Sequence, residues 1–178
     1  MRAKFVYAVL RICSLLSLKN NHRLGAFLGR LLYRYSDRIR KVSDTNIARC
    51  FPELSPQEQQ DYARNALIEM ARTFTESGLL WFANKDRVIK LAHETHGEDL
   101  IQQGLEKGKG VILAAPHMGN WEMLNLYASS RYPMTGLYSP LRMKALDDVI
   151  LSARRRFGTS VVPTNARGLR GLYQALAN

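Results

Sequence analysis

The pattern of apolar and polar positions changes near residue 86. Beyond that point, short runs rich in β-branched residues alternate with segments in which apolar positions recur every three or four residues. The first pattern is typical of strands and the second of helices. Strands are expected at Val88–Thr95, Val111–Ala115, Thr135–Tyr138 and Ser160–Val162, and helices at Glu98–Lys107, Trp121–Ser129, Leu146–Phe157 and Leu169–Ala177. This alternation predicts an α/β fold with a largely parallel sheet flanked by helices.

Two apolar stretches stand out in the N-terminal region. Phe5–Leu18 is short of the roughly 20 residues that a membrane-spanning helix needs. The second stretch has an apolar and a basic helical face, formed by Leu24, Phe27, Leu28, Leu31, Leu32, Tyr35 and Ile39 and by Arg30, Arg34 and Arg38. This pattern is typical of a helix that lies in the membrane interface. Two alternatives stay open: an amphipathic helix packed on its own domain, and a single anchor spanning residues 5–33.

A helix start signal marks the middle of the chain. The segment Asp44–Pro52 is expected to be a connection, after which Ser55 and Glu58 form a capping-box pattern around Pro56. A long helix should follow. We therefore expect a basic amphipathic membrane-associating region at residues 1–52 and an α/β domain at residues 53–178.

Charge is unevenly distributed along the 178 residues, which have a net charge of +11. Residues 1–50 alone carry eleven basic and two acidic side chains. Such a segment suits a polyanionic surface, either nucleic acid or anionic lipid headgroups. Nucleic-acid binding would need a basic groove with stacking aromatic residues, whereas this basic stripe accompanies an apolar face, so lipid is favoured.

The residues that commonly bind metals do not form a convincing site. Cys13 and Cys50 have neither disulfide nor metal spacing and are expected to be free thiols in a reducing compartment. His93 and His96 would face opposite sides of a strand. We expect no metal and no cofactor.

A histidine and a carboxylate stand on either side of a predicted turn. Along one helix, Glu122 would lie about 140° away from His117, at roughly 3.6 residues per turn. The two side chains can meet only if His117 lies in the turn and Glu122 in the first turn of the helix. A carboxylate on one imidazole nitrogen leaves the other nitrogen free to act as a base. The alternative is a structural turn histidine beside a glutamate that is favoured by the helix dipole.

The surrounding residues resemble a known family. The run Gly-Val-Ile-Leu-Ala-Ala-Pro-His-Met-Gly-Asn-Trp-Glu at residues 110–122 resembles the first motif of the bacterial lipid A biosynthesis acyltransferases, the late lauroyl and myristoyl transferases. The segment Asn46–Ser55, with its Cys-Phe-Pro-Glu run, resembles the same family. The resemblance implies a glycerolipid-acyltransferase-like fold, with residues 53–178 as the acyltransferase domain. Because family members are considerably longer, we expect a member truncated at its C-terminus.

The resemblance also implies how acyl transfer would proceed. His117 is expected to be the catalytic base and Glu122 the residue that orients it. Neither serine nor cysteine stands beside them in a nucleophile-elbow pattern, so direct attack by the acceptor hydroxyl is favoured. Backbone N–H groups around Gly119–Trp121 are expected to receive the oxyanion.

Arg154 is expected to bind substrate. The family's Tyr-basic-Pro triplet reads Tyr138-Ser139-Pro140 here, with Ser139 in place of the basic residue, and Arg154 matches the arginine that follows one helix later. A guanidinium suits bidentate binding of phosphate, so we expect Arg154 to bind a substrate phosphate and not to hold the fold. Asn120 and Tyr138 are expected to contribute to substrate binding.

The resemblance implies an enzyme of lipopolysaccharide biosynthesis on the cytoplasmic face of the cell inner membrane. It would move a fatty acyl chain from an acyl carrier protein thioester to a hydroxyl of a lipid A precursor. Its expected partners are acyl carrier protein, anionic membrane lipid and the glycolipid acceptor, with no nucleic acid. The alternatives are the same chemistry on another glycolipid, a phosphoinositide mannoside or an aminolipid, and an inactive membrane-binding fragment.

Overall fold

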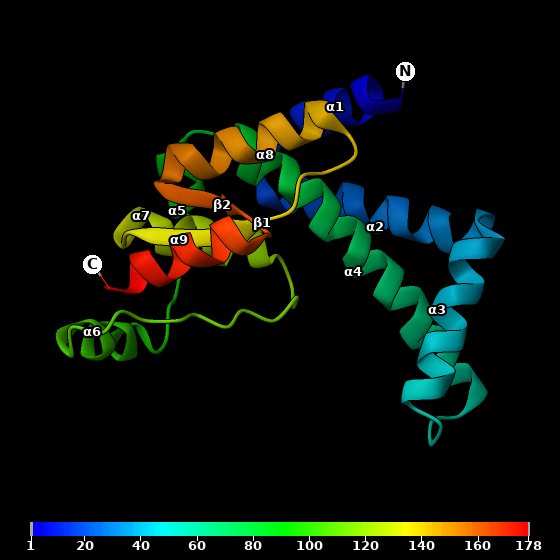
Figure 1. Cartoon of the computed structure of the whole chain (residues 1–178). Coiled ribbons are helices and arrows are strands. Elements are labelled where there is room, and N and C mark those ends of the chain that lie inside the picture. The colour runs from blue at the N-terminus through cyan, green and yellow to red at the C-terminus, as the bar shows by residue number, and fades with distance from the viewer. Residues whose placement is uncertain (1, 178) are drawn as a thin grey trace. The chain divides into compact units, whose positions relative to one another are not determined.

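A computed structural model describes residues 2–177 as a series of helices and two short strands (Figure 1). In chain order the elements are α1 (Arg2–Cys13), α2 (Leu18–Tyr35), α3 (Asp37–Cys50), α4 (Pro56–Phe82), α5 (Lys85–Ile89), α6 (Glu98–Glu106), α7 (Trp121–Arg131), β1 (Met134–Tyr138), α8 (Lys144–Phe157), β2 (Thr159–Pro163) and α9 (Ala166–Ala177).

The chain divides into two compact units. Val9–Leu79 forms a helical unit, and α1 up to Ala8 together with the chain from Leu80 forms an α/β unit. These limits do not coincide with the predicted regions 1–52 and 53–178, because most of α4 belongs with the helices that precede it.

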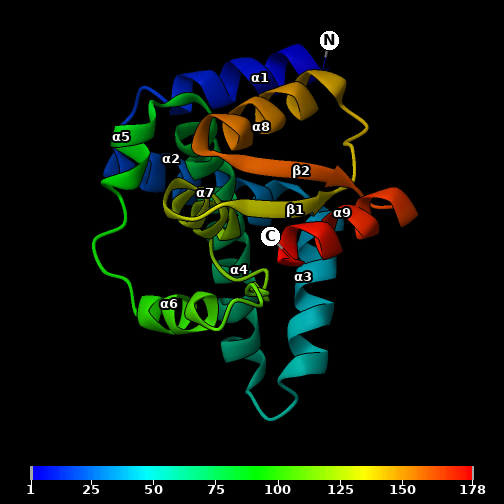
Figure 2. The same ribbon diagram turned by 60° about the vertical axis from the view of Figure 1, so that its left-hand side comes forward.

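Helices α2 and α4 approach each other closely in the helical unit. Gly25 and Gly29 of α2 are buried, and a Cβ atom on Gly29 would lie 2.5 Å from the Cα atom of Ile68 on α4. The contact therefore needs a residue without a side chain. A buried hydrogen bond from the Thr75 hydroxyl to the Asn21 carbonyl, 3.0 Å long, joins the same two helices. Figure 2 shows α3 and α4 running side by side towards the loop that connects them.

Two predictions for the N-terminal half are wrong. Asp44–Pro52 is mostly helical, since α3 continues to Cys50. The amphipathic stripe that was expected to reach Ile39 is divided between two helices, because the backbone leaves the helical conformation at Ser36, with φ −107° and ψ 88°.

The predicted helix start at Ser55 is confirmed: the Glu58 carboxylate accepts hydrogen bonds from the backbone N–H and the hydroxyl of Ser55, 2.9 and 2.6 Å long.

The two N-terminal apolar stretches form separate helices. Helix α1 ends at Cys13 and α2 begins at Leu18, where the Ser17 side chain accepts a hydrogen bond from the Asn20 backbone N–H. Within the described range, no helix has both the length and the apolar character needed to cross a membrane.

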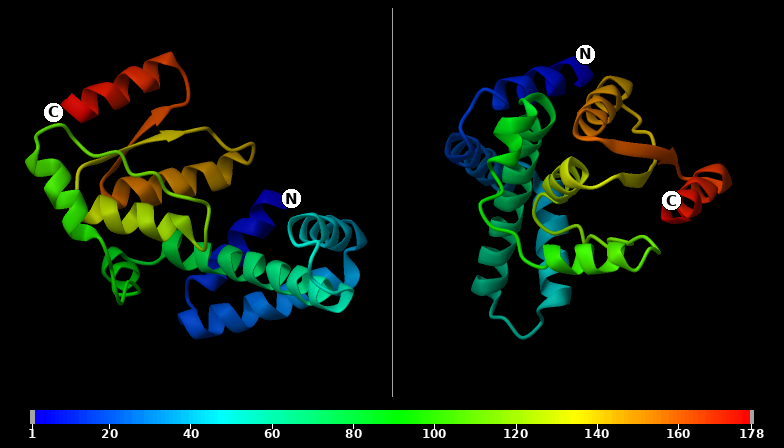
Figure 3. Two further views of the ribbon diagram at one scale, coloured as in Figure 1. Left: turned by 90° about the horizontal axis from the view of Figure 1, so that it is seen from below. Right: turned by 90° about the vertical axis from the view of Figure 1, so that its left-hand side faces the viewer.

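The α/β unit contains a parallel crossover, β1–α8–β2. The strands pair from Met134 opposite Thr159 to Tyr138 opposite Pro163. Figure 3 shows α9 on one face of the strands, with α7 and α8 on the other. Gly158 links α8 to β2 in the left-handed conformation, with φ 100°, which glycine adopts without steric cost. The Ser129 and Thr159 hydroxyls form a buried hydrogen bond 2.7 Å long, which ties α7 to β2.

The predicted sheet is only partly present. The strands expected at Thr135–Tyr138 and Ser160–Val162 form, and so do all four helices expected after residue 97. The predicted strand Val88–Thr95 is wrong, because α5 occupies its first residues after Asn84 caps that helix. Val111–Ala115 is not a strand either, since it pairs with no strand in the described chain and leaves Ile112 79% exposed. The fold is therefore mostly helical, with a small parallel sheet of two strands.

Candidate active site

Helix α7 buries a carboxylate at its beginning. Asn120 precedes the helix and its carbonyl accepts a hydrogen bond from the Met123 N–H, 2.9 Å long, although its side chain does not cap the helix. Glu122 lies in the first turn, where the helix dipole favours a negative charge. The residue is only 3% exposed, so its charge needs a partner inside the protein.

That partner is Arg154 of α8. Its Nε and Nη2 atoms donate to the two carboxylate oxygens of Glu122, over 2.9 and 2.7 Å. This fork geometry is the strongest form of an arginine–carboxylate contact. The hydrogen bonds to Glu122 raise the pKa of Arg154, against the effect of burial. The Arg154 guanidinium, which was expected to bind a substrate phosphate, is thus occupied by Glu122. Arg154 also helps to hold α7 against α8, contrary to the expectation that it does not hold the fold.

Tyr138 lies at the end of β1 against the same arginine. The guanidinium carbon of Arg154 is 5.1 Å from the centre of the Tyr138 ring, within the range of a cation–π contact. The Tyr138 hydroxyl donates to Asp147 Oδ1, and the Leu141 backbone N–H donates to the same oxygen over 2.7 Å. Burial, followed by this hydrogen bond to a carboxylate, raises the pKa of Tyr138. The two hydrogen bonds lower the pKa of Asp147.

His117 lies exposed in the loop before α7. Its ring packs against Trp121, with ring centres 4.8 Å apart and planes inclined at 50°. In the part of the chain that the structure describes, no hydrogen bond joins His117 to Glu122, whose two oxygens both accept from Arg154. The expected His117–Glu122 pair is therefore not formed in this conformation, although both residues flank the start of the same helix.

The turn between His117 and α7 is open. Gly119 has a φ of 53°, and a Cβ atom placed on it would meet nothing within 4 Å. The first N–H groups of a helix have no partner within the helix. The N-terminus of α7 thus presents hydrogen-bond donors beside the exposed imidazole, an arrangement suited to a developing negative charge on oxygen.

The predicted site residues form two neighbouring sets. Glu122, Arg154 and Tyr138 make one connected cluster, while His117 and Asn120 lie in the segment that leads into α7. The predicted residues did not include Asp147, which fixes the Tyr138 hydroxyl. Its only sequence signal is an acidic side chain in the first turn of α8, a common helix-start feature that does not identify its partner.

Comparison with known proteins agrees with the motif at residues 110–122. The sequence family "Bacterial lipid A biosynthesis acyltransferase" matches residues 2–178. The chain is 28% identical to the lipid A biosynthesis lauroyltransferase of Escherichia coli (strain K12), over 87% of this chain and 50% of that protein. It is 24% identical to the lipid A biosynthesis palmitoleoyltransferase of the same strain, over 86% of this chain and 49% of that protein.

A relative with a different acceptor in its name is similar to about the same degree. The phosphatidylinositol mannoside acyltransferase of Mycolicibacterium smegmatis (strain ATCC 700084 / mc(2)155) is 27% identical, over 74% of this chain and 43% of that protein. The chain spans about half the length of the curated relatives that it matches. With the family match extending over nearly its whole length, the chain belongs to the bacterial lipid A biosynthesis acyltransferase family.

Proposed function

We propose that this protein is an O-acyltransferase that moves a fatty acyl chain from an acyl carrier protein thioester to a hydroxyl of a lipid A precursor. One observation carries the proposal. A buried Glu122, held by Arg154, lies in the first turn of a helix that begins four residues after the exposed His117, in a chain of this family. The relatives named for lauroyl and palmitoleoyl transfer support the reaction class.

In the proposed reaction His117 removes the proton from the acceptor hydroxyl as its oxygen attacks the thioester carbonyl carbon. The carbonyl oxygen becomes an oxyanion and receives hydrogen bonds from the first N–H groups of α7. The C–S bond then breaks, and the leaving thiolate takes the proton from the imidazolium. Protons balance, and no covalent enzyme intermediate is needed.

Glu122 acts in this mechanism by orienting His117 and stabilising its charged form. Residues 107–120, which contain no helix or strand, provide the freedom for the ring to turn from Trp121 towards Glu122 when substrate binds. Arg154 holds the carboxylate in place through its two hydrogen bonds. Tyr138, which belongs to this cluster, and Asn120, two residues before Glu122, would contact the substrate.

We also propose that the reaction occurs at the cytoplasmic face of the inner membrane. Large apolar side chains of α1 and α2 support membrane association, since Ile12 and Phe27 are 59% and 56% exposed in a strongly basic segment. Exposed apolar residues combined with arginines are typical of helices that bind anionic membrane surfaces.

The test replaces His117 with alanine. Transfer from an acyl carrier protein thioester to a lipid A precursor should fall by about 10²–10⁴-fold, the usual contribution of a general base. His96→Ala is the matched control, because the His96 side chain is 83% exposed and lies outside the cluster. Near-normal activity of a folded His117→Ala protein would refute the mechanism.

A second acceptor has specific support from the Mycolicibacterium relative. The same assay with a phosphatidylinositol mannoside in place of the lipid A precursor compares the two functions. A higher kcat/KM for the mannoside would replace the lipid A assignment while leaving the chemistry unchanged.

A further inference from the structure

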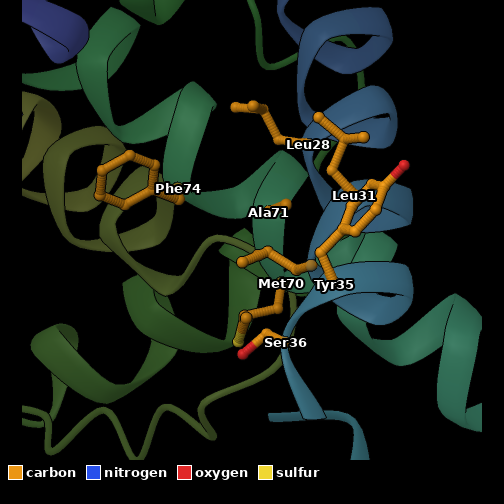
Figure 4. Close-up of a pocket in the computed structure, with 8 residues that line it drawn as sticks. Leu28, Leu31, Tyr35, Ser36, Met70, Ala71 and Phe74 are labelled. Carbon is orange, nitrogen blue, oxygen red and sulfur yellow. The ribbon is translucent and has the colours of Figure 1, made fainter. Parts of the chain in front are cut away.

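The helical unit contains an open apolar groove between α2 and α4. The groove has a volume of about 630 Å³ and is lined by Leu28, Leu31, Leu32, Tyr35, Ser36, Met70, Ala71 and Phe74. Figure 4 shows that Leu28, Leu31 and Tyr35 enter it from α2, while Met70, Ala71 and Phe74 enter it from α4. Its surface is almost entirely hydrocarbon, which excludes a polar ligand from its interior.

The packing of the two helices explains why the groove remains open. Gly25 and Gly29 turn towards α4 and bring the backbones together, so the larger side chains of α2 flank the contact. Tyr35, Met70 and Phe74 remain 73%, 49% and 42% exposed. Apolar side chains gathered in a concave surface favour a hydrocarbon occupant.

A basic pocket adjoins the apolar groove. It has a volume of about 660 Å³, shares Tyr35 with the groove, and is lined by Arg30, Tyr33, Arg34, Tyr35, Arg40, Gln57, Gln60, Asp61 and Arg64. Four arginines thus face a single carboxylate.

Two of these arginines already have acidic partners. Arg64 pairs with Asp61 over 2.9 Å, and Arg40 pairs with Asp37 over 2.6 Å. For Arg30 and Arg34, by contrast, residues 2–177 supply no ion pair. The pocket therefore retains positive charge that suits a phosphate group.

We infer that this pair of cavities binds one anionic phospholipid, with an acyl chain in the apolar groove and the phosphate at Arg30 and Arg34. The inference rests on the proposed membrane association but not on the acyl-transfer chemistry. It differs from adsorption to a membrane surface, because it requires a saturable site with a defined place for the tail. Such a lipid would fix the helical unit on the bilayer through two signals, hydrocarbon and charge, which together anchor more firmly than either alone.

The experiment uses short-chain lipids that dissolve as monomers. Dihexanoyl phosphatidylglycerol is titrated into the full chain by calorimetry, alongside dihexanoyl phosphatidylcholine, which has the same tails, and glycerophosphoglycerol, which has a related headgroup without tails. We expect saturable binding of one phosphatidylglycerol per chain. The zwitterionic lipid should bind at least about fivefold more weakly, as expected for the loss of one favourable charge contact near the surface.

Matched variants distinguish binding at this site from unspecific adsorption of lipid. Arg34→Gln should weaken phosphatidylglycerol binding about fivefold, whereas Arg38→Gln, which removes the same charge outside both cavities, should not. Leu31→Ser should weaken all tailed lipids, whereas Val42→Ser, which changes an exposed apolar residue of α3 outside both cavities, should not.

A second groove variant controls for the possibility that Leu31→Ser disturbs folding. Met70→Ser changes a half-exposed residue and should reproduce the Leu31→Ser effect with normal circular dichroism. Equal effects of Leu31→Ser and Val42→Ser would overturn the inference in favour of unspecific adsorption. Self-association that depends on Leu31 and Met70, without lipid binding, would assign the groove to a second copy of the chain.

Vesicles of phosphatidylglycerol in phosphatidylcholine complete the design. If the chain binds these vesicles but not the monomeric lipid, the groove site is refuted while the proposed membrane association stands. Binding to neither probe refutes both.

Discussion

The ion pair between Glu122 and Arg154 allows a quantitative test of how α7 and α8 are held together. Arg154→Gln removes both donors to the carboxylate, and Glu122 has a side chain only 4% exposed. Removing one partner of a buried pair typically costs about 3–5 kcal/mol, because the other charge remains buried without compensation. The Arg154 side chain is itself 17% exposed, so some water can enter and we expect about 3 kcal/mol.

Unfolding in urea and by heat measures this cost. For a chain of this size about 1 kcal/mol shifts Tm by roughly 2–4 °C, which gives a fall of roughly 6–12 °C for Arg154→Gln. Glu122→Gln should cost less, because it retains an oxygen that accepts a hydrogen bond and removes the buried negative charge. In the double variant two neutral amides face each other, so its loss should be smaller than the sum of the two single losses.

The double-variant loss differs from the sum of the two single losses by the coupling free energy between Glu122 and Arg154. This coupling is expected to exceed about 1 kcal/mol for residues in direct contact. Arg155→Gln is the control, since Arg155 lies exposed on the same helix and its replacement should be nearly neutral. Additive single losses, or an Arg154→Gln protein as stable as Arg155→Gln, would refute the structural role of the pair.

Two further predictions concern packing and acid stability. Gly29→Ala should lower the free energy of unfolding by about 1–3 kcal/mol in urea titrations, because its Cβ would lie 2.5 Å from the Ile68 Cα atom; a gain of about 1 kcal/mol from helix propensity alone would contradict the close contact. The hydrogen bond from the Tyr138 hydroxyl, followed by that from the Leu141 N–H, holds the pKa of Asp147 below its ordinary value of 3.8. Tyr138→Phe should therefore raise the pKa of Asp147, which NMR titration of the carboxylate can measure. Because the pKa of Asp147 is lower in the folded than in the unfolded state, the ionised Asp147 stabilises the fold above the unfolded-state pKa, and this contribution is lost as pH falls through the folded-state pKa. The Tyr138→Phe variant should therefore lose less stability than the wild type below about pH 4.

The sequence by itself determined most helices and the family. Caps and periodicity are local signals, and they correctly placed the start of α4 at its capping box and the helices α6 to α9. The crossover from β1 through α8 to β2 was likewise evident, because a strand, a helix and a strand follow one another within about thirty residues. The motif at residues 110–122 identified the family before any contact was known.

Only the tertiary structure decided which groups meet. Apolar composition predicts a strand at Val111–Ala115, but a strand exists only where another supplies hydrogen bonds, and none among residues 2–177 does so. Glu122 and Arg154 are 32 positions apart, and no local pattern shows that α8 turns its arginine towards the start of α7. In the same way, Gly25 and Gly29 lie among leucines and arginines, and their importance comes from the α4 backbone beside them. Periodicity reports which face of a segment is apolar, whereas contacts between distant segments depend on the packing of the whole chain.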